Sequence, residues 1–297
     1  MNRLIGRVRS RWKTLRRRGE AAYMRFERTV LPVRRLRNRI KTYRTNVFFV
    51  SFPKSGRTWV RFVLGQAIQT QYGIAKERKL ALDSTLYKMV TGKSIKISHD
   101  YGAREDAGYS GMNKGAFKGK RVFLLTRDIR DTLVSYYHHR YDRFSKIDMP
   151  LSEYVRSEIY GARKIALFYR SWHDNQHMPN AFLRVRYEDL RQDPFPNMRR
   201  IADFLLLNVI SDDVLQAACD AGEFSNMRRL ELNNEIVLLS RDGDASKMSE
   251  NATRVRKGKV GGYTEELNAD DLAYIDQVVE EVGIPKSWVY YDAEVKS

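Results

Sequence analysis

The chain has 297 residues, of which 42% are hydrophobic, and a formal net charge of +18. This is enough apolar sequence for one sizeable core. No apolar run approaches the roughly 20 residues that a membrane-spanning helix needs, and no signal-peptide pattern opens the chain. The single cysteine, Cys219, excludes an intramolecular disulfide and a cysteine-based zinc site. The sequence therefore predicts a soluble, cytoplasmic protein.

The positive charge is concentrated at the start of the chain. Residues 1–45 hold 16 of the 54 Lys and Arg residues but only two of the 36 Asp and Glu residues. Four apolar residues there recur at helical spacing, namely Leu4, Val8, Trp12 and Leu15. This pattern predicts an amphipathic arm that docks through residues 1–40 on an anionic membrane surface, at the periphery of the membrane. Two alternatives to membrane docking remain open. The arm could pack on the protein's own body, or it could bind acidic glycan or nucleic acid. Of these ligands, nucleic acid is not an expected partner.

Residues 46–297 are nearly balanced in charge and form the predicted catalytic domain. Apolar runs at residues 46–52, 121–126 and 181–186 predict strands, and a segment with helical periodicity follows each of them. This alternation is typical of a parallel β-sheet flanked by helices. The sequence therefore predicts an α/β fold of P-loop-like, three-layer type. The polar stretch from residue 239 to residue 262 predicts a long loop.

The segment FVSFPKSGRTW, which continues the first strand, predicts a phosphate-binding loop. A strand that passes through a glycine-containing turn into a helix presents backbone N–H groups and a positive helix end to an anion. Lys54 precedes Gly56, whereas in the Walker pattern the lysine follows the second glycine. We therefore expect a loop that holds phosphate but does not belong to a nucleoside triphosphatase. The alternative is a plain turn with a surface lysine.

Two further segments carry residues suited to binding anions. LLTRDIRDTLVSYYHH places Arg127 at a strand end and Ser135 about one turn inside a helix that begins near Asp131, so that both side chains could reach one phosphate. The planar guanidinium of arginine suits this task because it donates two parallel hydrogen bonds. The basic segment TRVRKGKVGGY follows far along the chain. Taken alone, each segment is more typical of a solvated surface.

Taken in order, four segments resemble the signatures of the PAPS-dependent sulfotransferases, where PAPS is 3′-phosphoadenosine 5′-phosphosulfate. They are FPKSGRTW, TRDIRDTLVSYYHH, RYEDLRQDP and RKGKVGG. The resemblance extends from near Asn46 to a helix around residues 270–282 and leaves the first 45 residues unexplained. It implies an enzyme that transfers the sulfuryl group of PAPS to a hydroxyl group, or an amine, of an acceptor. The product would be adenosine 3′,5′-bisphosphate, and no metal ion would take part.

The resemblance also implies roles for individual residues. Lys54 would stabilise charge on the departing phosphate, and His99, in KISHDYG, would be the general base. The donor site would combine the loop for the 5′-phosphosulfate, an adenine pocket and a clamp for the 3′-phosphate. The loop comprises Lys54, Ser55, Gly56, Arg57 and Thr58; the adenine pocket comprises Trp59, Tyr187 and Phe224; the clamp comprises Arg127, Ser135, Arg256, Lys257 and Gly258.

The chain departs from the family's pattern at several positions. Arg57 stands where cytosolic members have threonine, and Ile97 replaces a lysine often found two residues before the histidine. The sequence GGY replaces Gly-Asp-Trp after RKG, and no segment is a convincing match to the family's C-terminal dimerisation motif. The oligomeric state is therefore not predicted.

The acceptor is not identified by these motifs. The segments around residues 76–118, 143–180 and 225–255 mix aromatic and basic residues, which suits a small molecule, a glycan or a lipid-linked carbohydrate. Two other functions remain as alternatives. One is a nucleotide-dependent kinase with a related phosphate loop, and the other is a non-catalytic basic protein on the same fold that binds membrane or nucleic acid.

Overall fold

The computed structural model describes residues 43–74, 80–103, 109, 111–144, 149–233 and 258–291. The chain divides into two units, Met1–Thr45 and Asn46–Ser297, and the account below concerns the second. The predicted amphipathic helix of the arm lies outside the described residues, as do Arg256 and Lys257 of the basic loop. Within the described residues, no helix is both long enough and apolar enough to cross a membrane.

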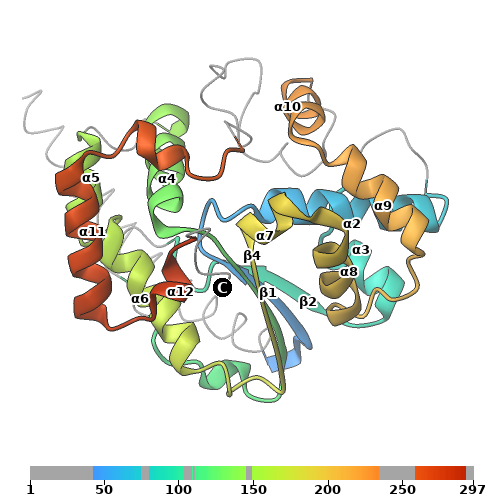
Figure 1. The fold of residues 1–297 in the computed structure, drawn as a ribbon. Coiled ribbons are helices and arrows are strands. Elements are labelled where there is room, and N and C mark those ends of the chain that lie inside the picture. The colour runs from blue at the N-terminus through green and yellow to red at the C-terminus, as the bar shows by residue number, and fades with distance from the viewer. Residues whose placement is uncertain are drawn as a thin grey trace, which may run out of the picture. The chain divides into compact units, whose positions relative to one another are not determined.

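A four-stranded parallel sheet lies at the centre of the second unit (Figure 1). Its strand order is β2-β1-β3-β4, and β1 pairs with both β2 and β3 while β3 pairs with β4. The strands are β1 (Val47–Ser51), β2 (Ile95–Ser98), β3 (Arg121–Thr126) and β4 (Ala181–Arg186). All five residues of β1 are buried, because a central parallel strand is covered on both faces, and this is why it reads as a continuous apolar run.

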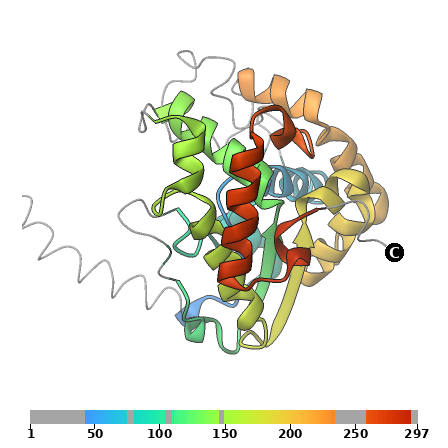
Figure 2. The ribbon, with the colours of Figure 1, turned by 60° about the vertical axis from the view of Figure 1, so that its left-hand side comes forward.

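Helices cover both faces of the sheet, which gives three layers. Alternate residues of β1 enter different apolar clusters, Val47 and Phe49 on one face, Phe48 and Val50 on the other. The first cluster is completed by α2 (Arg57–Gln71), α3 (Ser84–Thr91), α7 (Tyr187–Gln192), α8 (Pro194–Phe204), α9 (Asp212–Ala221) and α10 (Phe224–Leu232). The second is completed by α4 (Ile129–Phe144), α5 (Leu151–Arg156), α6 (Ala162–Asp174), α11 (Ala269–Val282) and α12 (Lys286–Val289). Figure 2 shows α11 alongside α6, with which it packs.

The predicted strands and the helices after them are present, with one shift that matters for the site. Helix α4 begins at Ile129, two residues before the predicted start near Asp131. Ser135 therefore lies in the second turn of the helix rather than about one turn inside it. Since all strands run in the same direction, the residues that follow them lie at one edge of the sheet, where ligands bind in open parallel sheets.

Candidate functional site

The loop between β1 and α2 has the backbone of an anion-binding turn. Lys54 (φ 68°) and Gly56 (φ 89°) both adopt the left-handed conformation, and the buried Ser55 hydroxyl between them donates a hydrogen bond to the Phe52 carbonyl at 3.0 Å. Gly56 is the N-cap of α2, where no side chain caps the helix and no acidic residue lies in the first turn. The positive end of α2 is thus left to an external anion, which fits the predicted phosphate loop.

Tyr187, the first residue of α7, packs directly against this loop. A Cβ atom on Gly56 would lie 2.3 Å from Cδ2 of the Tyr187 ring, so only glycine fits there. The guanidinium of Arg127 lies 4.7 Å from the centroid of the same ring. The end of β4, the phosphate loop and the end of β3 therefore meet at Tyr187.

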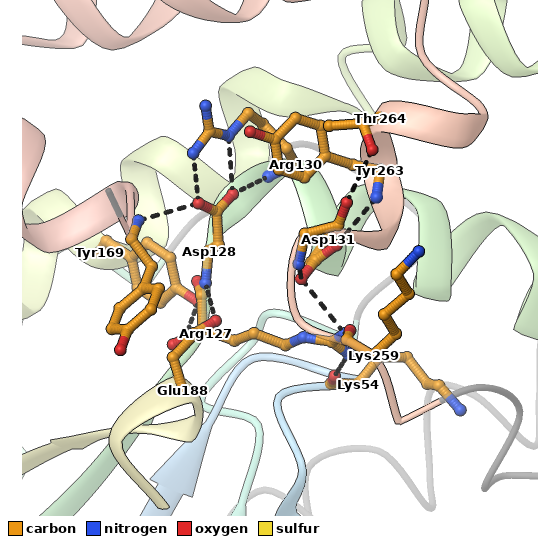
Figure 3. A network of polar contacts seen from close by, with 12 residues as sticks. Lys54, Arg127, Asp128, Arg130, Asp131, Tyr169, Glu188, Lys259, Tyr263 and Thr264 are labelled. Atoms are coloured by element: carbon orange, nitrogen blue, oxygen red, sulfur yellow. Dashed lines mark hydrogen bonds and ion pairs between the residues drawn. The ribbon is translucent and has the colours of Figure 1, made fainter. Parts of the chain in front are cut away.

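Arg127 joins the phosphate loop to the segment that follows Gly258 (Figure 3). Its Nη1 donates to the Lys54 carbonyl at 3.1 Å and its Nη2 donates to the Lys259 carbonyl at 3.3 Å. The Tyr169 hydroxyl holds the backbone of Arg127 by accepting from its N–H at 3.1 Å and donating to its carbonyl at 2.9 Å. The guanidinium is thus held at the edge of the loop, where an arginine can bind a phosphate group.

Asp131 fixes the segment after Gly258 to helix α4. Its carboxylate accepts hydrogen bonds from the backbone N–H groups of Gly261 at 2.9 Å and of Tyr263 at 3.1 Å, and its Oδ2 lies 3.6 Å from Nη2 of Arg127 (Figure 3). The sequence analysis did not identify Asp131. The available signal was an acidic residue only four positions after Arg127, at the junction of β3 and α4.

Asp128, the residue after Arg127, and Glu188 are both buried and are joined by a hydrogen bond. Asp128 accepts from the N–H and the guanidinium of Arg130 and from the N–H of Tyr291. Its own N–H donates to Oε1 of Glu188 at 2.8 Å. Burial raises the pKa of Glu188 to about 7, against the partly compensating hydrogen bond from Asp128. The sequence analysis did not select either carboxylate as a site residue. In the described part of the chain, no group of His, Cys, Asp and Glu residues is arranged to hold a metal ion.

Trp59 and Phe224, the other two residues of the predicted adenine pocket, contact the segments at Gly222 and Gly258. The indole N–H of Trp59 donates to the Gly222 carbonyl at 2.6 Å, two residues before Phe224. A Cβ atom on Gly258 would lie 2.1 Å from Cδ2 of Phe224, so the ring of Phe224 is packed on the backbone of Gly258. The structure thus brings the start of α2, the start of α10 and the end of the basic loop together.

His99 follows β2 and has both ring nitrogens engaged. Nδ1 lies 2.9 Å from the Ser51 carbonyl, which can only accept, so Nδ1 carries the proton. Nε2 therefore presents its lone pair, and Nη2 of Arg57 donates to it at 2.6 Å. Burial, and then the cationic Arg57, hold the pKa of His99 well below its usual range. The ring is neutral at physiological pH, and its basic nitrogen points toward the phosphate loop.

A buried ion pair fixes the turn after His99. The Lys114 side chain is fully buried, and its Nζ lies 2.5 Å from Oδ2 of Asp100 and 2.5 Å from the hydroxyl of Tyr109. Asp100 (φ 42°) and Tyr101 (φ 68°) adopt left-handed conformations. The ion pair thus holds a strained turn at the residue next to His99. No local pattern in the sequence indicates this contact, because Lys114 is one of many lysines.

The other predicted site residues are placed as follows. Thr58 lies in the first turn of α2 and Ser135 in the second turn of α4, and both side chains are partly exposed. Residues from β1, β2, β3, β4 and the segment after Gly258 therefore surround one edge of the sheet. The described residues bring the loop, Arg127 and His99 to this edge, with contacts from Trp59, Tyr187 and Phe224, and the roles of these residues stay predictions.

Known proteins resemble this chain in sequence and in fold. The chain matches the sulfotransferase domain family over residues 44–284. A flavonol sulfotransferase-like protein of Flaveria bidentis is 26% identical over 266 residues, which cover 80% of this chain and 81% of that protein. An amine sulfotransferase of Oryctolagus cuniculus is 20% identical over 267 residues, which cover 86% of this chain and 87% of that protein.

Solved structures show the same fold. A mouse sulfotransferase complexed with PAP superposes with a TM-score of 0.56 at 18% identity, covering 83% of this chain and 90% of that one. Retinol dehydratase, in complex with androsterone and the inactive cofactor PAP, superposes with a TM-score of 0.60 at 18% identity. The superposition covers 84% of this chain and 83% of that one. The predicted α/β fold is thereby confirmed, and the family match confirms the predicted enzyme class, a sulfotransferase. Because the family match spans the sheet, the phosphate loop and the segment after Gly258, the chain belongs to the sulfotransferase family.

Proposed function

We propose that this protein transfers the sulfuryl group of PAPS to a hydroxyl group of an acceptor and releases adenosine 3′,5′-bisphosphate. The observation that carries the proposal is that His99 and Arg127 both contact the phosphate loop. Nε2 of His99 lies 2.6 Å from Nη2 of Arg57. Nη1 of Arg127 lies 3.1 Å from the carbonyl oxygen of Lys54. A base and a phosphate-binding arginine thus lie on either side of the uncapped end of α2.

The donor is held by groups that the loop and the strand ends present. The backbone N–H groups from Ser55 to Thr58 bind the 5′-phosphosulfate, and Lys54 neutralises it. Arg127 and Ser135, together with the basic loop, bind the 3′-phosphate. The aromatic rings form the adenine pocket, in which the base stacks on a flat apolar partner. The basic-loop residues are Arg256, Lys257 and Gly258, and the aromatic residues are Trp59, Tyr187 and Phe224.

The chemistry requires one proton transfer and stabilisation of one developing charge. Nε2 of His99 removes the proton of the acceptor hydroxyl as the acceptor oxygen forms a bond to sulfur. The bond between sulfur and the 5′-phosphate oxygen breaks, and its electron pair stays on the phosphate. Lys54 and the N-terminus of α2 stabilise that charge. As in loose phosphoryl transfer, positioning and electrostatics supply the catalysis, and no metal ion is needed.

The acceptor is proposed to be a hydroxylated small molecule, with a glycan or a lipid-linked carbohydrate as the other candidates. Relatives are named as flavonol and amine sulfotransferases, and one is named a cytosolic sulfotransferase. The basic arm would bring an acceptor at an anionic membrane surface to the site. A screen of hydroxylated acceptors with labelled PAPS identifies the class. Cosedimentation of the full-length protein, and of a variant without residues 1–40, with anionic vesicles tests the arm.

Calorimetry tests the donor site. Adenosine 3′,5′-bisphosphate is expected to bind far more tightly than adenosine 5′-monophosphate, because Arg127 and the basic loop pair with the 3′-phosphate. Equal affinities would refute the donor assignment. Turnover of ATP that depends on magnesium would instead support the kinase alternative.

The base is tested by substitution. His99→Ala is expected to abolish turnover without weakening the binding of the bisphosphate, since the base contacts the acceptor. Lys54→Ala is expected to reduce both. Retention of most activity in His99→Ala would show that another group is the base.

A further inference from the structure

The contact between Arg57 and His99 conflicts with the proposed role of the histidine. A neutral imidazole has one lone pair, and here it lies on Nε2, because Nδ1 donates to the Ser51 carbonyl at 2.9 Å. Nη2 of Arg57 occupies that lone pair at 2.6 Å. A general base must lie within about 2.6–3.2 Å of the hydroxyl oxygen that it deprotonates. Arg57 and an acceptor hydroxyl therefore compete for the same position, and only one can bind there at a time.

Arg57 is also placed to reach the donor. It is the first residue of α2 and follows Gly56, the uncapped N-cap of the helix. The oxygens of a phosphosulfate group bound at that helix end would lie beside its backbone. A guanidinium binds a phosphate or sulfate group through two charge-assisted hydrogen bonds, whereas a neutral imidazole offers it only one lone pair. The donor thus has the differential affinity that is needed to draw Arg57 away from His99.

We propose that Arg57 is a positioning residue with two alternative partners. It covers Nε2 of His99 in the contact described above, and it pairs with the 5′-phosphosulfate oxygens once the donor is bound. This rests on the proposed roles of His99 and of the phosphate loop. Donor binding then exposes the base, so that an acceptor which arrives first cannot be deprotonated. It also brings one more cation to the group that is transferred.

The surroundings of His99 make this contact measurable. Helix α2 contributes the charge of Arg57, and β1 contributes the Ser51 carbonyl. In the turn after His99, the carboxylate of Asp100 is paired with Lys114. Lys54 is the other cation of the phosphate loop. Among these groups, Arg57 is the charge that lowers the pKa of His99, and its removal should therefore raise that pKa.

The experiment follows the titration of the His99 ring by NMR, with its resonance assigned by its loss in His99→Gln. In the free protein, Arg57→Thr is expected to raise the pKa of His99 by about 1 unit, the size of effect that a neighbouring charge produces. Arg61→Thr is the matched control, because it removes an arginine from the next turn of α2 where Nε binds the Leu82 carbonyl at 2.7 Å. It should leave the pKa of His99 unchanged.

Two nucleotides test whether the donor moves Arg57. Adenosine 3′,5′-bisphosphate should raise the pKa of His99 in the wild-type protein by about 1 unit, and by clearly less in Arg57→Thr. Adenosine 3′-monophosphate lacks the 5′ group and should produce no shift. Arg57→Thr should also weaken binding of the bisphosphate by about tenfold, the loss of one charge-assisted contact, and leave binding of the 3′-monophosphate unchanged.

Each part of the proposal has a separate failure. An unchanged pKa of His99 in free Arg57→Thr overturns the capping contact. Equal shifts in the wild type and in Arg57→Thr on addition of the bisphosphate overturn the exchange of partners. Neither result depends on turnover. Retention of activity in His99→Ala would instead overturn the proposed base, whatever Arg57 does.

Discussion

The carboxylate of Asp131 accepts a hydrogen bond from the backbone N–H of Gly261 at 2.9 Å, across 130 residues of sequence. The same carboxylate accepts from Tyr263 at 3.1 Å. The segment that continues the basic loop is therefore fastened to α4, the helix that follows Arg127. Arg127 reaches the same segment at the Lys259 carbonyl. The segment after Gly258 is thus held beside Arg127 by a residue that the sequence analysis did not select.

Asp131→Asn is expected to weaken binding of adenosine 3′,5′-bisphosphate by about tenfold. An amide can accept from one of the two N–H groups but not from both, and an unsatisfied buried donor costs about 1–3 kcal/mol. Adenosine 5′-monophosphate should lose little, because it lacks the 3′-phosphate. Asp270→Asn, at an exposed acidic residue in the first turn of α11, is the control. Calorimetry with both nucleotides measures the difference. Tighter binding by Asp131→Asn would show that the carboxylate competes with phosphate for Arg127.

Gly56→Ala is expected to destabilise the protein and to impair donor binding more than tenfold. Gly56 has φ 89°, and a Cβ atom would collide with the ring of Tyr187. Gly73 separates the backbone strain from the collision with a neighbouring ring. It also has a positive φ, of 60°, but nothing lies within 4 Å of its Cβ position. Gly73→Ala should therefore cost only the strain of a left-handed residue, about 1–2 kcal/mol. Chemical denaturation compares the variants, and equal losses would contradict the close packing of Tyr187 on the loop.

The fold could be predicted because its signals are local. Continuous apolar runs marked β1 and β3, and helical periodicity marked α2 and α4. In a parallel sheet this order also fixes which strand ends lie together. The motifs at Lys54 and Arg127 follow those strand ends, and so their proximity could be inferred before any coordinates were known.

The contacts that hold the site could not be predicted in the same way. The hydrogen bonds of Asp131 and the pairing of Arg57 with His99 join residues that are 130 and 42 positions apart. They depend on side-chain direction and on the exact first residue of a helix. The displacement of the start of α4 by two residues shows how coarse a periodicity argument is at helix ends. Residues 1–42, 256 and 257 lie outside the described residues, and so their predicted roles stay predictions.

Glu188 is expected to make stability depend on pH. Burial raises the pKa of its carboxyl group from 4.5 to about 7 in the folded protein. Between these values the unfolded chain has lost the proton that the folded protein keeps, so the free energy of unfolding falls as pH rises from about 4.5 to about 7. The full effect is on the order of 3 kcal/mol. It is present below pH 4.5 and lost above pH 7.

Glu188→Gln should remove this dependence. The amide oxygen can still accept from the N–H of Asp128, while the group no longer titrates. Urea unfolding at pH 5 and at pH 7.5 gives the difference for each protein. The wild type should lose more stability than the variant between the two pH values. If both lose the same amount, the carboxyl group of Glu188 has an ordinary pKa in the folded protein.

Lys114 is expected to support catalysis from a distance by holding the turn that follows His99. Lys114→Met leaves the carboxylate of Asp100 buried without its cation, and breaking a buried ion pair costs about 3–5 kcal/mol. The melting temperature and kcat should both fall, while the affinity for adenosine 3′,5′-bisphosphate stays the same, because the ion pair contacts the turn of the base and not the donor loop. Lys118→Met, at an exposed lysine, is the control.

A double variant separates the effect on stability from the effect on catalysis. Adding Asp100→Asn to Lys114→Met removes the buried unpaired charge and should recover much of the melting temperature. It should not recover kcat, since the strained turn at Asp100 and Tyr101 still lacks the contact that held it. Full recovery of kcat in the double variant would show that the ion pair stabilises the fold without positioning His99.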